Sequence, residues 1–362
     1  MKRIKKTLVL ATSMVALIAC GNGGSLNQSS ADEGYAEINV RDGKKSLLAA
    51  FEKSCLHDAI ALNGRIKAEG SLECSAYSYR DFYSSNPGYY SGYYYRSYEV
   101  NSFKGELKAD YEIAASVDGL QAIDVNQLHS SVNLKGSHDC KITADTGLNI
   151  HSELTTDSSA YLTNNLVFFN FDTGLANFLA EYFRYHYGTS KIYFPASIPS
   201  KACPLLNYSN VQVATQFISK GLDYSELYVP GAVTYGQKDN NYKAELALDV
   251  DTIVSFFTLT SNGTYTPNFG KKADLRKASL AIRYTTEGIT DISLDIVGTL
   301  DCLMGNLMPL NNYRSYPEDF VLSPVVADIN LGIFFSFAYD QRVTLPSNLG
   351  EYAPVDPRTI FG

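Results

Sequence analysis

The strongest periodic signal in the sequence is FKGELKADYEIAASV, residues 103–117. Its odd-numbered positions, from Phe103 to Val117, are apolar or small, and charged residues from Lys104 to Glu112 stand between them. This period of two over fifteen residues predicts a strand of roughly 50 Å, because each residue adds about 3.3 Å. One face of such a strand is buried while the other meets water, a pattern typical of antiparallel sheets.

Similar alternation recurs along the chain and predicts nine or more strands, several of them long. The clear segments are 128–144, 242–250, 280–284, 292–302 and 325–339, and the weaker ones are 66–76, 148–154, 161–171 and 191–194. We therefore expect a fold of the α+β class that is dominated by one large antiparallel sheet.

Helices are fewer. An amphipathic segment runs from Lys44 to about Ile60, and a second helix is expected after Asp172 or Thr173, which would cap it, and before Gly188. Shorter candidates are 211–220 and 251–259. Because a sheet with one apolar face must cover that face, we expect a strongly curved half-barrel with these helices on its concave side. Residues 35–362 would form this single domain.

The first nineteen residues have the features of a secretory signal. Four basic residues precede an apolar stretch that runs from Leu8 to Ala19, and the sequence Leu-Ile-Ala-Cys ends at Cys20. This tetrad resembles the bacterial lipobox, which implies cleavage before Cys20 and attachment of a diacylglycerol to its sulfur. The alternative is a short helix with a buried cysteine.

Residues 20–34 follow as a segment rich in Gly, Ser, Asn and Asp, which predicts a flexible tether behind the lipid. The expected location is the cell envelope: the protein would be lipid-anchored and extracytoplasmic, on the outer face of the plasma membrane or on an outer membrane if one is present. The membrane would then be its first partner, held through Cys20.

The net charge argues against a nucleic-acid partner. The whole chain has a formal charge of −8, and loss of the signal leaves 26 basic against 38 acidic residues, a charge of −12. Beyond the first twenty residues no apolar run reaches about 18 residues, so we expect no membrane-spanning helix in the mature chain.

A nine-residue pattern occurs three times, as IKAEGSLEC (66–74), VNLKGSHDC (132–140) and LDIVGTLDC (294–302). In each copy the cysteine falls in phase with the apolar positions, so it is expected to point inward. An oxidising compartment favours disulfides, but five cysteines allow at most two bridges within one chain, and the pairing stays open. The candidates are Cys55, Cys74, Cys140, Cys203 and Cys302. The spacing does not favour a metal site of the three strand cysteines with His138, and none is predicted.

The sequence contains no GxSxG, SxxK, HExxH, Walker or GxGxxG motif, so we predict a protein that is not an enzyme and needs no cofactor. His129 and His138 are an odd number of residues apart and are expected on opposite faces of one strand, in structural roles. Because catalytic triads are assembled in space, a hydrolase stays the less favoured alternative.

Residues 77–98 form an insertion with nine tyrosines and an Asn-Pro-Gly turn at 86–88. Tyrosine combines flat contact area with a hydrogen-bonding tip, which suits a surface that binds a glycan or a protein. The interpretation we favour is a long hairpin whose tyrosines pack along its own base.

Two further stretches carry a resemblance. KASLAIRYTTEGITDISLDIVG (277–298) is predicted to be a hairpin that turns at Glu287-Gly288, and VTLPSNLGEY (343–352) is a terminal strap with proline, leucine and tyrosine. With the lipobox and the long strands, this pattern over residues 44–352 resembles the LolA/LppX-like lipoproteins. The resemblance implies a half-barrel with helices as a lid and an apolar cavity between them.

Two hypotheses for function follow. In the first, the half-barrel binds a lipid or another apolar ligand, and nonpolar contacts alone hold it. In the second, the core is packed solid and the protein is a surface scaffold that contacts a protein or glycan through residues 77–98. The side chains expected to line the cavity are Leu107, Tyr111, Ile113, Leu134, Ile282, Leu294 and Phe335 from strands, and Phe178 and Phe183 from the lid.

Overall fold

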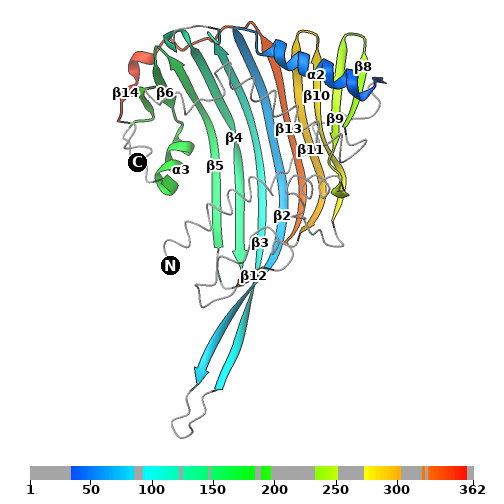
Figure 1. Ribbon diagram of the computed structural model, residues 1–362. Coiled ribbons are helices and arrows are strands. Elements are labelled where there is room, and N and C mark those ends of the chain that lie inside the picture. Colours follow the sequence, from blue (N-terminus) through cyan, green and yellow to red (C-terminus); the bar gives the residue numbers. More distant parts are fainter. Residues whose placement is uncertain are drawn as a thin grey trace.

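The computed structural model describes residues 34–84, 93–121, 125–145, 147, 149–183, 189–196, 233–251, 273–302, 320–322 and 325–356. Strands dominate this part of the chain, as the alternation predicts (Figure 1). In chain order they are β1 (Ala36–Glu37), β2 (Ala59–Ser84), β3 (Tyr93–Asp118), β4 (His129–Ala144), β5 (Asn149–Thr163), β6 (Leu166–Asn170), β7 (Lys191–Pro195), β8 (Val233–Lys238), β9 (Asn241–Ala247), β10 (Asp274–Thr285), β11 (Gly288–Cys302), β12 (Phe320–Leu322), β13 (Val325–Tyr339) and β14 (Ala353–Pro354).

All of these strands belong to one sheet, in the order β1-β8-β9-β10-β11-β13-β2-β3-β4-β5-β6-β7-β14, with β12 pairing β2 off this path. Every pairing is antiparallel except that of β14 with β7. The path has two ends, at β1 and β14, so the sheet is open, and Figure 1 shows its long strands bending along their length. The predicted β-dominated fold with one large antiparallel sheet is confirmed.

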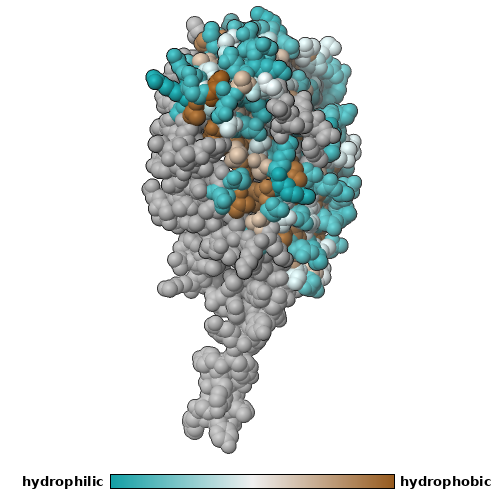
Figure 2. All heavy atoms as spheres, turned by 90° about the vertical axis from the view of Figure 1, so that its right-hand side faces the viewer, coloured by the Kyte–Doolittle hydropathy of each residue, from teal (hydrophilic) through white to brown (hydrophobic). Residues whose placement is uncertain are grey.

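The register divides the sheet into two faces. We call the face that carries Ile66, Tyr111, Leu134, Leu294 and Phe335 the apolar face, and the opposite one the charged face. Every Asp, Glu, Lys and Arg of β4, β5, β9, β11 and β13 lies on the charged face. The same holds for residues 59–73 of β2, 102–118 of β3 and 277–285 of β10. Hydrophilic residues also cover much of the surface in Figure 2, whereas hydrophobic ones gather near its middle.

Helix α2 (Val40–Ser54) packs on the apolar face near one end of the sheet. The Asn39 side chain caps it by accepting a hydrogen bond from the Asp42 N–H at 2.9 Å. Its Leu47 is fully buried against a cluster that includes Tyr235 and Tyr284. The predicted end near residue 60 is wrong, because the chain leaves the helix after residue 54 and enters β2 at residue 59.

Helix α3 (Thr173–Phe183) lies over β5 on the same face (Figure 1). Asp172 caps it as predicted, since its Oδ1 accepts a hydrogen bond from the Leu175 N–H at 2.8 Å. Both described α-helices therefore contact the apolar face. The predicted helix at 211–220 lies outside the described residues, as does 251–259 apart from residue 251. Within the described ranges no helix is long and apolar enough to cross a membrane.

The repeated pattern places glycines where the sheet has no room for a side chain. Gly136 has φ +155°, and a Cβ there would come within 2.1 Å of the Asp110 carbonyl oxygen. Gly298 has φ +156° and faces an irregularity in the register of β10. Only glycine adopts this backbone conformation without strain. The repeat thus places glycine at two positions of the sheet that need it.

The tyrosine-rich insertion is a hairpin in its backbone. The pairing of β2 with β3 runs without a break from Ala59 opposite Asp118 to Ser84 opposite Tyr93, and the ribbon projects away from the rest of the sheet (Figure 1). The predicted hairpin is therefore confirmed. The side chains of residues 77–98 lie outside the described part of the structure, so their packing stays a prediction.

The disulfide prediction is wrong for two of its five candidates. Cys55, at the end of α2, and Cys140, in β4, are free thiols. The physical reason at Cys140 is its register, which places Leu107 and Ser152 beside it on the neighbouring strands. The other candidates, the side chains of Cys74, Cys203 and Cys302, lie outside the described part, as do Cys20, the signal and most of the tether.

Candidate functional site

The strand residues predicted to line a cavity all lie on the apolar face and are half-buried. Ile113 and Leu134 are register partners, and Phe335 is separated from Ile113 only by Gly64 of β2. The Phe335 ring covers that glycine, because a Cβ at Gly64 would lie 2.2 Å from its Cδ1 atom. The remaining members of the set on this face are Leu107, Tyr111, Ile282 and Leu294.

These residues do not share one environment. Ile282 packs against the buried cluster beneath α2, so it belongs to the core of that end of the sheet. Leu294 lies in a continuous apolar row with Ile333 and Ile66, which leads across β13 and β2 to Tyr111. The predicted residues are thus spread over two regions, the packed core beneath α2 and the central strands of the sheet.

The two predicted lid residues belong to α3. Phe178 presents its ring edge-on to the His138 imidazole, with 5.9 Å between the ring centroids and 85° between the planes. The helix therefore approaches the apolar face at β4 through this contact. The side chain of Phe183 lies outside the described part of the structure.

A chain of hydrogen bonds crosses the apolar face at this point. The Tyr111 hydroxyl lies 2.7 Å from His138 Nδ1, and His138 Nε2 lies 3.2 Å from the Ser152 hydroxyl. Burial lowers the pKa of His138, and it raises the pKa of Tyr111 to about 12, so both groups are uncharged at neutral pH. His138 shares this face with Cys140, while His129 contacts Thr163 on the other, as their spacing predicts.

The sequence singled out Tyr111 but did not place His138 or Ser152 in the site. The contact between Tyr111 and His138 is diagonal, since the register partner of Tyr111 is Gly136. The ring of Tyr111 lies across that glycine, where a Cβ would come within 2.8 Å of its Cδ1 atom. One signal was available: the other two copies of the repeat have Leu72 and Leu300 where this copy has histidine.

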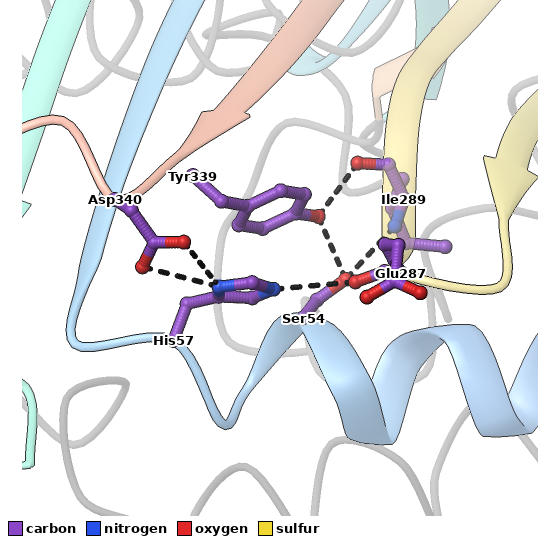
Figure 3. Close-up of polar contacts among 6 residues, drawn as sticks. All are labelled: Ser54, His57, Glu287, Ile289, Tyr339 and Asp340. Carbon is purple, nitrogen blue, oxygen red and sulfur yellow. Dashed lines mark hydrogen bonds and ion pairs between the residues drawn. The ribbon is translucent and has the colours of Figure 1, made fainter.

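A second group of polar side chains joins α2 to the ends of two strands (Figure 3). His57 Nδ1 lies 3.1 Å from Asp340 Oδ2, and its Nε2 lies 3.2 Å from the Glu287 carbonyl oxygen. The Ser54 hydroxyl instead contacts Tyr339, at 2.7 Å. Because both ring nitrogens of His57 and the serine hydroxyl have these other partners, the group holds elements together and does not form a catalytic triad.

Metal chemistry has no support in this part of the protein. Among the described residues, no three or more His, Cys, Asp or Glu side chains lie close enough to hold a metal ion. Burial, together with the charge of Asp139, raises the pKa of the Cys140 thiol, which disfavours the thiolate that would bind metal or attack a substrate. What the site offers is apolar contact with one embedded chain of hydrogen bonds.

Comparison with known proteins gives little to add. No protein-family model matches the sequence, and no curated protein is significantly similar to it. Among solved structures, the chain matches the crystal structure of a Pseudomonas aeruginosa FadL homologue with 8% identity, over 89% of this chain and 98% of that one. The TM-score of this match is 0.16, which is too low to indicate a shared fold or function.

Proposed function

We propose that this protein is a membrane-anchored, extracytoplasmic lipoprotein that is not an enzyme and binds a lipid or another apolar ligand on the concave side of a half-barrel. The observation that carries the proposal is the apolar face of the sheet. It is continuous from β10 to β4, and several of its described members, such as Ile66, Leu294 and Ile333, are only half-buried.

The energetics of such a face suit an apolar ligand. Each Å² of apolar surface removed from water contributes about 25 cal/mol, so a long chain laid across several strands binds without directional contacts. The charges are segregated to the other face, where pairs such as Lys108 with Glu69 and Lys141 with Asp139 remain near water. A ligand on the apolar face would therefore bury few charges.

Anchoring of the protein rests on Cys20 and the tether of residues 20–34. Each buried methylene of an acyl chain contributes roughly 0.8 kcal/mol, so two or three chains hold the protein on a membrane. The Cys20→Ala variant cannot receive the lipid. When its signal is removed by other means, we expect this variant to leave the membrane fraction. Retention of that variant on the membrane would contradict the lipoprotein assignment.

Ligand binding can be tested with two alanines of β3 that lie on opposite faces. Ala109 is on the apolar face between Ala68 and His138, whereas Ala114 is on the charged face between Asn63 and Asn133. Filling the ligand space with Ala109→Phe should weaken binding of the uncharged dye Nile red about tenfold or more, a loss of about 1.4 kcal/mol. Ala114→Phe should bind it like the unchanged protein.

Native mass spectrometry of the same variants supplies a second readout. We expect a co-purifying mass of several hundred daltons, extractable into organic solvent, to be present with Ala114→Phe and reduced with Ala109→Phe. Equal dye binding and equal ligand content in both variants, with unchanged thermal stability, would reject the apolar face as the binding site.

The second candidate function is a surface scaffold with a packed core, and one observation favours it. The β2–β3 ribbon continues well beyond the sheet, to the pair Ser84–Tyr93, and projects as a separate arm (Figure 1). Such an arm would carry the tyrosines of residues 77–98 to a protein or glycan partner. Replacing residues 77–98 by a short turn should then abolish co-sedimentation with purified peptidoglycan while leaving Nile red binding unchanged.

A further inference from the structure

We propose that Tyr111, His138 and Ser152 form a polar anchor that hydrogen-bonds the uncharged polar group of an otherwise apolar ligand. This inference rests on the proposed binding function and specifies the chemistry of the ligand. The three side chains come from the adjacent strands β3, β4 and β5, and all point to the apolar face.

A polar side chain at position 138 costs folding free energy unless it forms hydrogen bonds. Burying an imidazole without hydrogen bonds costs a few kcal/mol, whereas leucine at the same place contributes packing. Two copies of the repeat do have leucine there, Leu72 and Leu300, and both lie on the apolar face. The third copy has His138, with Tyr111 and Ser152 placed to bond both of its ring nitrogens.

The hydrogen bonds from Tyr111 through His138 to Ser152 must all run in one direction, from donor to acceptor. A neutral imidazole has one donor and one acceptor nitrogen. If Tyr111 donates to Nδ1, then Nε2–H donates to Ser152, whose own hydroxyl proton is left to donate outward. In the other tautomer Ser152 donates to Nε2, and the Tyr111 hydroxyl proton points outward. In both cases one end of the chain can donate to a ligand and the other can accept.

The surroundings select against a charged ligand group. On the described apolar face of β2 to β5, β11 and β13 there is no Lys or Arg to pair with a carboxylate or phosphate, within the residue ranges given above for that face. The Phe178 ring that packs against His138 adds an apolar neighbour. An unpaired charge in such surroundings is strongly disfavoured. A hydroxyl, ester or amide on a long apolar chain is complementary to this anchor.

The test compares three probes of equal chain length, 1-decanol, decane and decanoate, as competitors of Nile red at pH 7.5. The protein is the full chain with Cys20→Ala, in which every described residue is unchanged. One hydrogen bond is worth about 1 kcal/mol net, so we expect decanol to bind roughly five- to tenfold more tightly than decane. Decanoate should bind most weakly.

The variants separate the anchor from the apolar site. His138→Leu, which installs the residue of the other repeat copies, should reduce decanol to the affinity of decane while decane binding stays the same. Ser152→Ala makes the smallest change and should remove part of the decanol preference. His129→Leu, on the charged face of the same strand, is the matched control and should change neither.

Each outcome has a distinct meaning. If neither Nile red nor decane binds, the proposed function fails. If all probes bind but His138→Leu and Ser152→Ala leave the decanol preference intact, the anchor is rejected and the apolar site stands. Tightest binding of decanoate would overturn the inference that the ligand group is uncharged.

Discussion

The hydroxyl groups of Ser54 and Tyr339 lie 2.7 Å apart, although 285 residues separate them in the chain (Figure 3). The same serine oxygen accepts a hydrogen bond from the Ile289 N–H at 2.9 Å, and the tyrosine donates to the Ile289 carbonyl at 2.6 Å. His57 stacks on the Tyr339 ring with 4.3 Å between the ring centroids. The end of α2, the start of β11 and the end of β13 are thereby joined.

Removing the Tyr339 hydroxyl should therefore destabilise the protein. Tyr339→Phe keeps the ring but leaves the Ile289 carbonyl and the Ser54 hydroxyl short of a partner, at a cost of about 1–3 kcal/mol. Urea unfolding gives the measurement. The control is Tyr193→Phe, because among the described residues the Tyr193 hydroxyl has no hydrogen-bond partner and its ring only stacks on Phe168. Equal stability of the two variants would contradict the role of the Tyr339 contacts.

The need for glycine at position 136 can be tested in the same way. Gly136→Ala places a Cβ within 2.1 Å of the Asp110 carbonyl oxygen at a φ of +155°, so we expect a loss of more than about 2 kcal/mol. Gly350→Ala is the control, since a Cβ at Gly350 meets nothing within 4 Å, and its effect should stay within about 0.5 kcal/mol. A mild effect at Gly136 would show that β3 and β4 can adjust to a side chain there.

Two Arg–Asp pairs of the charged face should differ in strength. The Arg283–Asp291 pair, at 2.7 Å, has side chains that are only 16% and 17% exposed, whereas both side chains of Arg65–Asp110 are 40% exposed. Asp291→Asn should cost about 1.5–3 kcal/mol because it removes a charge-assisted bond from a desolvated site. Asp110→Asn should cost only about 0.2–1 kcal/mol, since water and salt screen that pair. The reverse order in urea unfolding would contradict this ranking.

The Arg65 hydrogen bond lowers the pKa of Asp110, which gives its contribution a pH dependence. A carboxylate whose pKa is lower in the folded state stabilises the protein above its unfolded pKa, and the contribution is lost as pH falls through the folded value. The unchanged protein should therefore lose more stability than Asp110→Asn on acidification below about pH 4, the ordinary pKa of Asp. Parallel stability curves for the two proteins would show that the pair contributes nothing.

The free thiols of Cys55 and Cys140 predict a labelling pattern. Burial raises the pKa of both thiols, with further contributions from Glu52 and Asp139, so iodoacetamide should react slowly with the native protein at pH 7.5. In urea without reductant both should be alkylated, each identified by peptide mass. Failure to label either one until reductant is added would restore the disulfide that the sequence suggested.

Much of the local structure follows from the sequence alone. Period-two alternation predicted β13 with both of its ends and β4 to within one residue, because the side chains of a strand alternate strictly between its faces. The same alternation put Tyr111 and Leu134 on the apolar face, and Asp172 was recognised as the cap of α3. These features depend on residues that are only a few positions apart in the sequence, so the sequence alone predicts them.

The tertiary structure decided what those elements bring together. No local pattern reveals that β13 pairs with β2, because this pairing joins segments more than 250 residues apart. The pairing of β11 with β13 also joins segments that no short window of sequence connects. The contact of Tyr111 with His138 depends in addition on the register of β3 against β4, since a shift of one residue would turn one ring to the opposite face. The sequence thus determined which face each side chain occupies, and the packing of distant strands decided which of them meet.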